Sequence, residues 1–218
     1  MLYISRIGRI YNICYIFNCW WQAEQMKLEL KHKIQSILPF LTEEVIDSLI
    51  SKKMLYEIEV KKGDNVLNEG EICKNIYFIL SGSIRQFGLK DGEEINFLFY
   101  FESDFVFDEP SFYNKTSSNY YFKTLENCTI LKFDKTLFDF LIGDNNFSQF
   151  LFNLSKQNVV RLYKRNEVLL MDTPKERYLK LLEIHPTIME KVSLAKIASF
   201  IGITAPSLSR IRNRLVKG

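Results

Sequence analysis

Residues 194–215, LAKIASFIGITAPSLSRIRNRL, hold two short runs of apolar residues at helical spacing with a glycine between them. Ser193 can cap the first helix, and Gly202 can adopt the left-handed backbone conformation that ends it. Thr204 can cap the second helix, which begins at Ala205. A helix, a glycine-containing turn and a second helix form the helix-turn-helix pattern. The stretch therefore predicts a helix-turn-helix unit.

The second of these helices is predicted to have two unlike faces. Leu208, Ile211 and Leu215 share one face at about 100° per residue. The opposite face, its flanks and the start of the helix carry the residues that we predict to contact DNA: Thr204, Pro206, Ser207, Ser209, Arg210, Arg212, Asn213, Arg214 and Lys217. Arg and Asn can pair with guanine and adenine in the major groove, which admits a helix. Residues 191–218 contain six Lys or Arg and no Asp or Glu, so a polyanionic partner is expected.

Two other interpretations of this basic helix stay open. It can be a basic surface helix without a partner, or part of a module that binds RNA or an acidic protein. Salt-dependent, sequence-preferring binding to duplex DNA separates the favoured interpretation from both.

The overall composition is that of a globular protein. The 218 residues are 47% hydrophobic and 25% charged, with a formal net charge of +3. This length allows one or two domains with a hydrophobic core. The four cysteines, Cys14, Cys19, Cys73 and Cys128, are too sparse for a disulfide framework, which indicates a reducing compartment and a cytoplasmic location.

Residues 1–25 are predicted to be an extension that is either unstructured or absent from the native protein. Their apolar stretch RIYNICYIFNCWW is interrupted by Asn12 and Asn18 and is too short to cross a membrane as a helix. It also lacks the small-residue cleavage site of a signal peptide. A domain start at Met26 fits better, and we expect no membrane partner. A membrane anchor and a packed or partner-binding segment are the alternatives.

Residues 26–143 change from helical to strand-like patterns at Met54. Apolar residues at helical spacing predict helices between residues 27 and 50, the second capped by Thr42. After Met54, short apolar or alternating segments recur every roughly 8–12 residues between turns, and Asp91-Gly92 is a strong hairpin signal. This pattern predicts an antiparallel β-roll or barrel.

One long helix is predicted over residues 144–171, since residues 145–173 contain no Gly or Pro. Its predicted apolar seam, with one polar residue that can fix the register, consists of Phe147, Phe150, Leu151, Leu154, Asn158, Leu162 and Leu169. A single stripe of this length predicts pairing with a second copy of the chain. The alternative is a helix that packs only on its own domain. Thr173-Pro174 then starts a further helix that stops at Pro186.

Together these motifs resemble those of the Crp/Fnr family of bacterial transcription regulators over residues 27–217. The resemblance rests on KKGDNVLNEGE, IYFILSGSIR and ESDFVFDEPSF in the roll, and on TPKERYLKLL and LAKIASFIGITAPSLSRIRNRL after it. It implies an α+β fold in three parts. These are an N-terminal, cyclic-nucleotide-binding-like antiparallel β-roll over residues 26–143, a dimerisation helix over residues 144–171 and a helix-turn-helix DNA-binding domain over residues 172–218.

The resemblance also implies a homodimer that regulates transcription by binding a two-fold operator in double-stranded DNA, with RNA polymerase as a further candidate partner. Arg210 matches the arginine of the family's recognition helix. Ala205-Pro206 departs from the Arg-Glu pair that the best-known member has at the start of that helix. Base contacts are therefore expected to come from Ser207, Ser209, Arg210 and Asn213.

The family's phosphate-binding cassette corresponds to residues 105–122, FVFDEPSFYNKTSSNYYF. Phe107 stands at its glycine position, Asp108 or Glu109 at its glutamate position and Ser118-Asn119 at its Arg-Ser position, and these are the candidate ligand-pocket residues. A buried phosphate needs a cation and N–H donors, and here the arginine is missing while two acids are present. We therefore expect no response to cyclic AMP. A core filled by aromatic side chains is favoured, and the alternatives are a cyclic nucleotide site or a non-nucleotide small ligand that switches DNA binding.

Enzymatic activity is not expected. Residues 54–142 contain no His, so a metal site of the cupin type in the roll would lack its ligands. No P-loop, G-x-S-x-G or C-x-x-C motif occurs. The cysteines do not form the iron–sulfur cluster pattern of oxygen-sensing family members, since Cys14 and Cys19 lie in the extension. We therefore expect no metal and no cofactor.

Overall fold

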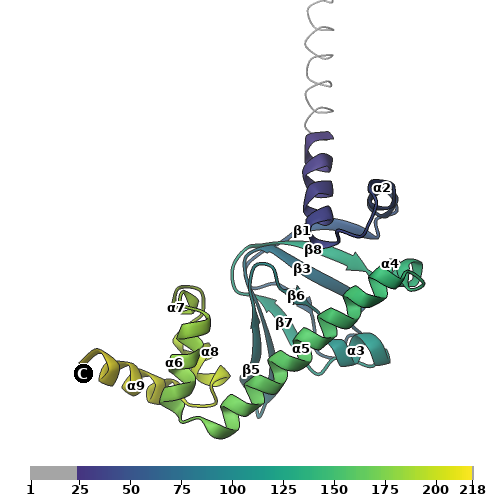
Figure 1. Ribbon diagram of the computed structural model, residues 1–218. Coiled ribbons are helices and arrows are strands. Elements are labelled where there is room, and N and C mark those ends of the chain that lie inside the picture. The colour runs from purple at the N-terminus through teal and green to yellow at the C-terminus, as the bar shows by residue number, and fades with distance from the viewer. Residues whose placement is uncertain (1–23, 218) are drawn as a thin grey trace, which may run out of the picture. The chain divides into compact units, whose positions relative to one another are not determined.

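The computed structural model describes residues 24–217, of which Val216 and Lys217 are described by their backbone only (Figure 1). The chain divides into two compact units, Met1–Lys53 and Met54–Gly218. The boundaries predicted from the sequence, after residues 25, 143 and 171, divide the chain differently and stay predictions. Of the predicted extension, residues 1–23 lie outside the described residues, and residues 24 and 25 are helical.

The described part of the first unit consists of two helices. Residues 24–37 form one helix, and α2 (Glu43–Ser51) forms the other. The Thr42 hydroxyl accepts a hydrogen bond from the backbone N–H of Val45 at 3.4 Å, which confirms the predicted cap of α2. Lys31 pairs with Asp47 at 2.6 Å and so joins the two helices. Most of the apolar side chains that predicted the helices are buried, among them Ile34, Leu38, Leu41, Ile46 and Leu49.

The second unit begins with two four-stranded antiparallel sheets, which confirm the predicted β-roll. One sheet has the strand order β1-β8-β3-β6 and the other β2-β7-β4-β5. The strands are β1 (Leu55–Val60), β2 (Asn65–Leu67), β3 (Asn75–Ser81), β4 (Ile84–Lys90), β5 (Glu93–Tyr100), β6 (Phe105–Val106), β7 (Tyr121–Thr124) and β8 (Cys128–Asp134). Because the two sheets face each other, the apolar residues of their alternating strands fill the space between them.

Asp91 and Gly92 form the two-residue turn between β4 and β5, as predicted. Both have a positive φ, 54° and 81° respectively, and Lys90 pairs with Glu93 across the turn. Two central residues with positive φ are typical of a type I′ turn, whose twist matches that of the strands it joins. The turn therefore sets the register that positions the side chains of β5.

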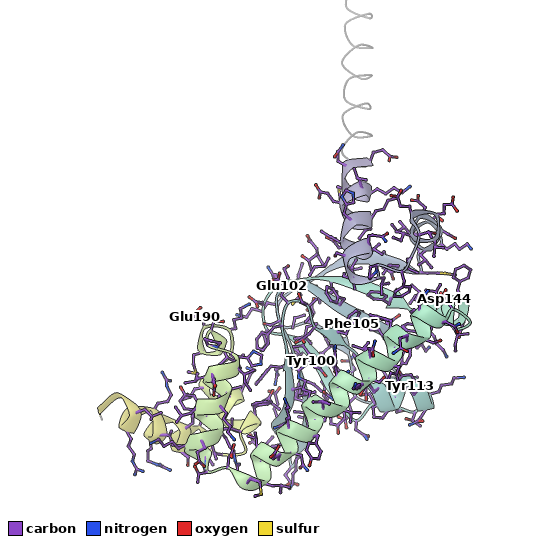
Figure 2. The ribbon with its side chains drawn as sticks, in the orientation of Figure 1. Tyr100, Glu102, Phe105, Tyr113, Asp144 and Glu190 are labelled. Carbon is purple, nitrogen blue, oxygen red and sulfur yellow. The ribbon has the colours of Figure 1, made fainter. Side chains whose placement is uncertain are left out.

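Helices α3 (Glu109–Asn114), α4 (Lys135–Leu141) and α5 (Asn145–Met171) follow or interrupt the strands. Helix α5 runs along the roll from α4 to α6 (Figure 1). Phe105 of β6, labelled in Figure 2, joins it to the sheet. The ring of Phe105 lies 5.4 Å from that of Phe150 on α5 and 4.8 Å from that of Phe78 on β3. Helix α5 is long but carries many charges, and none of the described helices combines the length and apolarity that crossing a membrane requires.

The C-terminal helices are α6 (Pro174–Ile184), α7 (Ile188–Lys191), α8 (Leu194–Phe200) and α9 (Ala205–Lys217). Thr173 and Glu176 form a capping box at the start of α6: the Thr173 hydroxyl accepts from the Glu176 N–H at 3.4 Å, and the Thr173 N–H donates to the Glu176 carboxylate at 2.8 Å. The core of these helices contains Tyr178, Leu181, Ile188, Val192, Ile197, Ala198, Ile201 and Leu208, and it includes Phe99 of β5. Strand β5 therefore shares a hydrophobic core with the helix-turn-helix domain.

Candidate nucleic-acid interface and roll pocket

The turn between α8 and α9 fixes the direction in which α9 leaves the domain. Gly202 has a φ of 74°, which confirms the predicted left-handed conformation. Its N–H donates to the Ser199 carbonyl at 3.2 Å, and the Ile203 N–H donates to the Ala198 carbonyl at 2.9 Å. These two hydrogen bonds are those of the Schellman motif, which satisfies the last carbonyls of a helix. Ile203 also packs against the hydrophobic core of the domain, so the turn is rigid.

The two predicted caps of this unit have different outcomes. The Thr204 hydroxyl accepts a hydrogen bond from the Ser207 N–H at 3.4 Å and so caps α9, as predicted. Ser193 occupies the N-cap position of α8 with an extended backbone, but its side chain makes no capping hydrogen bond. The predicted position of the cap is therefore confirmed, whereas the side-chain capping bond is not formed.

Helix α9 presents its basic side to solvent. Leu208 is fully buried and Ile211 packs against the same core. Leu215, predicted on the apolar face, is exposed because the core reaches only as far as Ile211. The predicted contact residues that are exposed are Thr204, Pro206, Arg210, Arg212, Asn213 and Arg214, while Ser207 and Ser209 are half-buried. The side chain of Lys217 lies outside the described part of the chain.

The basic face of α9 has no acidic counterpart nearby. The Arg210 guanidinium donates to the Ser207 hydroxyl at 2.9 Å, and none of Arg210, Arg212 and Arg214 makes an ion pair with a described residue. The only described basic residue of the segment that pairs with an acid is Lys191, whose ammonium lies 3.2 Å from Glu126 of the roll. Guanidinium groups held without a carboxylate partner are free to bind phosphates or base edges.

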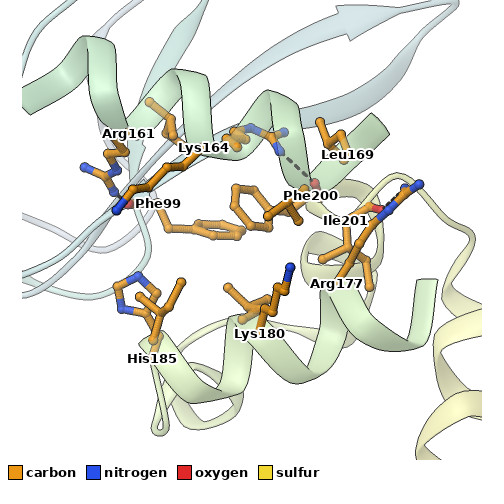
Figure 3. A pocket seen from close by; sticks show the side chains of 14 residues that line it. Phe99, Arg161, Lys164, Leu169, Arg177, Lys180, His185, Phe200 and Ile201 are labelled. Carbon is orange, nitrogen blue, oxygen red and sulfur yellow. Dashed lines mark hydrogen bonds between the residues drawn. The ribbon is translucent and has the colours of Figure 1, made fainter. Parts of the chain in front are cut away.

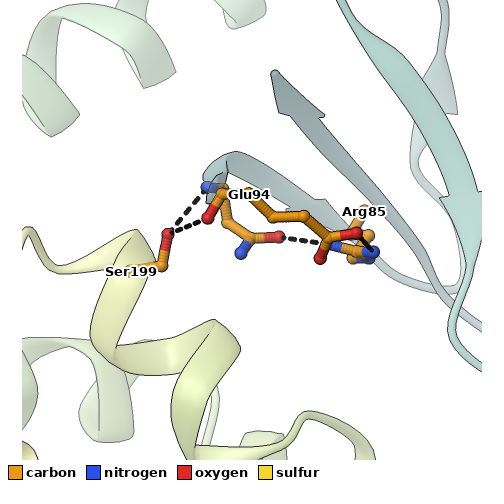
Figure 4. A network of polar contacts seen from close by, with 4 residues as sticks. Arg85, Glu94 and Ser199 are labelled. Atoms are coloured by element: carbon orange, nitrogen blue, oxygen red, sulfur yellow. Dashed lines mark hydrogen bonds and ion pairs between the residues drawn. The ribbon is translucent and has the colours of Figure 1, made fainter. Parts of the chain in front are cut away.

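Helix α8 is joined to the roll by the hydroxyl of Ser199. This hydroxyl donates to the Glu94 carbonyl at 2.9 Å and accepts from the Asn96 N–H at 3.0 Å, and we call the pair of hydrogen bonds the Ser199 bridge (Figure 4). Arg85 on β4 holds the same part of β5 from the other side, with 2.6 and 2.8 Å bonds to the two carboxylate oxygens of Glu94. The strand that contacts the helix-turn-helix domain is therefore fixed on both sides.

The seam predicted for dimerisation is divided between two faces of α5. Phe147 and Leu154 are buried within the chain, and the Asn158 amide donates to the Glu109 carboxylate at 3.0 Å. The half-buried members are Phe150, Leu151 and Leu169, and only Leu162 is exposed. Phe147 and Leu154 are thus covered and Asn158 is hydrogen-bonded within their own chain, so the structure does not bring the predicted seam onto one exposed face.

A different stripe of α5 is apolar and exposed. Phe152, Val159, Tyr163 and Leu170 have exposed fractions of 63%, 63%, 72% and 74%. They follow one another at intervals of seven, four and seven residues, which is the spacing of a coiled-coil stripe. This spacing is present in the sequence, but it alternates along the helix with the stripe that contains Phe147 and Leu154. The two stripes can be told apart only by which side chains are buried in the structure.

The residues predicted to line a ligand pocket in the roll fall into two groups. Phe107, Asp108 and Glu109 line a cavity of about 170 Å³, which we call the roll pocket, together with Arg161 and Arg165 of α5. Ser118 and Asn119 are not among the residues that line it. The Ser118 hydroxyl is buried and hydrogen-bonded to the backbone of Tyr120, while Asn119 is exposed, so the structure does not bring these two residues together with the other three at the roll pocket.

Glu109, Arg161 and Arg165 of the roll pocket make polar contacts within the chain. Burial raises the pKa of Glu109, and the hydrogen bond from Asn158 opposes this shift. Arg161 donates to the Phe99 carbonyl and lies 3.6 Å from Asp104, and Arg165 donates to two backbone carbonyls. The sequence analysis missed these two arginines as pocket residues, because they come from a helix far along the chain.

Aromatic rings narrow the roll pocket further. The rings of Phe97 and Tyr120 meet edge to face with centroids 4.7 Å apart, and the Tyr100 hydroxyl pairs with the Gln86 side chain at 3.1 Å. This packing agrees with the favoured interpretation of residues 97–122 as an aromatic core. Cys73 and Cys128 are buried free thiols, while Cys14 and Cys19 lie outside the described residues.

Comparison with known proteins places the fold. Residues 57–145 match the cyclic nucleotide-binding domain family. FixK2 from Bradyrhizobium japonicum is similar with a TM-score of 0.67 and 16% identity, over 75% of this chain and 85% of FixK2. A putative transcriptional regulator of the Crp/Fnr family from Eubacterium rectale gives a TM-score of 0.65 and 21% identity, over 83% of this chain and 86% of that one. No curated protein sequence matches the chain.

The c-di-GMP responsive global regulator CLP from Xanthomonas campestris is a third similar structure, with a TM-score of 0.62, 14% identity and coverage of 78% of this chain and 92% of CLP. The described chain is thus a cyclic nucleotide-binding-type roll followed by a long helix and a helix-turn-helix domain. This is the fold of the Crp/Fnr family of transcription regulators, which confirms the α+β fold and the resemblance found in the sequence.

Proposed function

We propose that this protein is a homodimeric, sequence-specific DNA-binding regulator of transcription. The observation that carries the proposal is the two-sided character of α9. Leu208 anchors the helix in the core, while Arg210, Arg212, Asn213 and Arg214 are exposed and make no ion pair with a described residue. A basic helix held rigidly from behind has the chemistry to enter the major groove.

The dimer part of the proposal is supported by the exposed stripe of α5, Phe152, Val159, Tyr163 and Leu170. A stripe of four large apolar side chains in water is unfavourable, and pairing with the same stripe of a second copy removes it from water. Such a dimer is symmetric, so its two α9 helices meet DNA as a pair and select a two-fold operator.

The proposed regulator does not respond to cyclic AMP. The carboxyl groups of Asp108 and Glu109 both line the roll pocket, and their negative charge would repel the phosphate of a cyclic nucleotide. Cyclic AMP and cyclic GMP are therefore expected to leave the melting temperature of the protein unchanged. Clear stabilisation by either nucleotide would contradict this part of the proposal, because a ligand that binds the folded state raises its stability.

The DNA-binding part is tested by selecting duplexes from a random pool with the purified full chain and measuring binding to the selected sequence. Arg210→Ala should lose about 1–3 kcal/mol of binding free energy and relax the preference at one base position. Lys90→Ala, which removes an exposed cation at the tip of the β4–β5 hairpin, is the matched control and should bind normally. Failure to enrich any duplex at low ionic strength, or normal binding by Arg210→Ala, would refute the proposal.

The same binding experiment separates duplex DNA from RNA. Affinity for the selected duplex should fall steeply with salt, and excess unrelated RNA should compete only weakly. We also propose a cytoplasmic location, in keeping with the two buried free thiols Cys73 and Cys128.

A further inference from the structure

A second cavity, of about 200 Å³, lies where the roll, α5 and the helix-turn-helix domain meet. We call it the junction pocket. Its walls include Phe99 of β5, Val168 of α5, Leu181 of α6 and Phe200 of α8. The rings of Phe99 and Phe200 lie between α5 and α6 with centroids 5.0 Å apart (Figure 3). The cavity is smaller than the roughly 300–1,000 Å³ typical of sites for drug-sized ligands, so it suits a slender molecule.

The charged residues that line the junction pocket are all cations. They are Arg161, Lys164, Arg165, Arg177 and Lys180. Two of them have carboxylate partners: Arg161 lies 3.6 Å from Asp104, and Lys180 lies 2.7 Å from Asp172. Lys164, Arg165 and Arg177 make no ion pair with any described residue. An apolar cavity edged by unpaired cations is complementary to an anion with a hydrocarbon body.

Arg165 is half-buried, and it is the member of this group that lies over an aromatic wall of the pocket. Its guanidinium donates to the carbonyls of Phe200 at 3.3 Å and Asn96 at 3.2 Å, and it lies 4.4 Å from the centroid of the Phe200 ring. Burial lowers the pKa of Arg165 to about 10, so the group is still charged at neutral pH. A half-buried cation that has only carbonyl partners lacks an opposite charge, and an anion brought next to it is stabilised.

We propose that the junction pocket binds an amphipathic carboxylate with a hydrocarbon chain of medium length. The hydrocarbon lies against Phe99, Leu181 and Phe200, and the carboxylate faces Arg165 and Lys164. A nucleotide fits poorly, because the apolar walls would leave its hydroxyl groups without hydrogen-bond partners. An uncharged hydrocarbon would provide no negative charge to pair with Arg165.

Because of where the junction pocket lies, a bound ligand can affect how the helix-turn-helix domain contacts the roll. One wall belongs to β5 of the roll and another to α6 and α8, so a bound chain contacts both parts at once. Ser199, whose bridge joins α8 to β5, directly precedes Phe200 in the wall of the pocket. If the helix-turn-helix domain can take two positions on the roll, a ligand that binds one of them more tightly favours that position. Duplex affinity then changes to the extent that the ligand prefers one position over the other. This consequence rests on the proposed function, whereas binding of the carboxylate does not.

The binding test is calorimetric titration of the full chain with decanoate. Saturable binding of one decanoate per chain is expected. Decanol and decyltrimethylammonium keep the chain but lack the negative charge, butyrate keeps the charge but lacks the chain, and all three should bind much more weakly. Absence of decanoate binding, or equal binding of decanol, would overturn the proposal.

Variants locate the ligand. Arg165→Met should weaken decanoate binding by about 10- to 100-fold, as expected for loss of a charged hydrogen-bond partner. Since this change also removes two structural hydrogen bonds, Ile184→Trp serves as the second variant: Ile184 is an exposed lining residue, and the larger side chain should block the pocket. Lys156→Met removes an exposed cation of α5 outside the pocket and should bind decanoate normally. Normal binding by Ile184→Trp would place the ligand elsewhere and refute the proposal.

The regulatory consequence has its own measurement. Saturating decanoate should change the affinity for the selected duplex by about fivefold or more, a typical coupling between two sites. An unchanged duplex affinity refutes this consequence while leaving carboxylate binding in place. Decanoate binding by a chain that binds no duplex at all would instead refute the proposed function.

Discussion

Arg85 is the buried charge that organises the strand next to the helix-turn-helix domain. Besides its two bonds to the Glu94 carboxylate, its guanidinium donates to the Asn96 side chain at 3.1 Å and lies 3.9 Å from the centroid of the Phe87 ring. Burying a guanidinium is costly unless its charge is paired. Here Glu94 and Asn96 bind its two terminal nitrogens, while its buried Nε has no partner among the described residues. The Arg85–Glu94 ion pair therefore holds Glu94 and Asn96 in position. The Ser199 bridge, which uses the backbone of these two residues, depends on the same ion pair.

This ion pair predicts a pH dependence of stability. The hydrogen bond and charge of Arg85 hold the pKa of Glu94 below its ordinary value of 4.5. Because the folded state has the lower pKa, the stabilisation is fully present above the ordinary value and is lost as the pH falls through the folded value. Glu94→Gln should lower stability at neutral pH and weaken the loss of stability in acid, as measured by urea unfolding across this range. The neighbouring exposed Glu93→Gln is the control, and an equal effect of both variants would contradict the prediction.

Gly202 is the residue on which the helix-turn-helix turn depends. Its φ of 74° is strained for any residue with a Cβ, and a Cβ there would lie 3.3 Å from a guanidinium nitrogen of Arg177. Gly202→Ala should therefore reduce the free energy of unfolding by about 1–2 kcal/mol. Gly143→Ala is the matched control, since no atom lies within 4 Å of its Cβ position and no positive φ is recorded there. Thermal unfolding should show a loss only for Gly202→Ala, and equal stability of the two variants would refute this account.

At the scale of single residues, the sequence predicted the caps and turns that depend only on residues nearby in the chain. Gly202, Thr204 and the Asp91-Gly92 turn act on neighbours a few residues away, so their residue types were enough. The Ser199 bridge joins residues 103 positions apart, and no local pattern indicates which hydroxyl will meet which strand. Arg161 and Arg165 were missed for the same reason, because their roles follow from the way α5 lies on the roll.

At the scale of elements, the bounds of α5 were predicted correctly, but the face that packs within the chain was not. Its bounds, Asn145–Met171, agree with the predicted helix because Gly and Pro are absent from it. Its apolar residues form two stripes, and both fit a helical period. Phe147 and Leu154 of one stripe are buried within the chain, whereas Phe152, Val159, Tyr163 and Leu170 of the other are exposed and form the stripe that we propose to contact a second copy.

The exposed stripe predicts which substitutions separate the dimer. Tyr163→Glu places a charge in the middle of the proposed seam and should weaken dimerisation by roughly 3 kcal/mol or more, because like charges would be buried without partners. Analytical ultracentrifugation should then show a monomer at concentrations where the unaltered chain is a dimer. Leu89→Glu changes an equally apolar, exposed residue of the β4–β5 hairpin and should leave the dimer intact. A dimeric Tyr163→Glu protein would place the contact on another surface.

At the scale of the molecule, the order of elements was more predictable than their pairing. Turn spacing indicated an antiparallel roll, and the helix-turn-helix pattern was visible at the C-terminal side. The strand orders β1-β8-β3-β6 and β2-β7-β4-β5 join segments from opposite ends of the roll, and such pairings depend on long-range contacts that alternation cannot specify. The shared core of β5 with α6 and α8 was likewise invisible, since Phe99 looks like any other apolar strand residue.

The proposed dimer makes a geometric prediction about its operator. Two α9 helices related by two-fold symmetry should contact major grooves about 34 Å apart, one turn of B-DNA. Inserting about five base pairs at the centre of the selected site turns one half-site to the opposite side of the duplex. A rigid dimer can then engage only one half-site, so affinity measured by electrophoretic mobility shift should fall to that of a single half-site. Replacing the same central base pairs without changing the length should have a much smaller effect, and unaltered binding to the lengthened site would mean that the two helices bind independently.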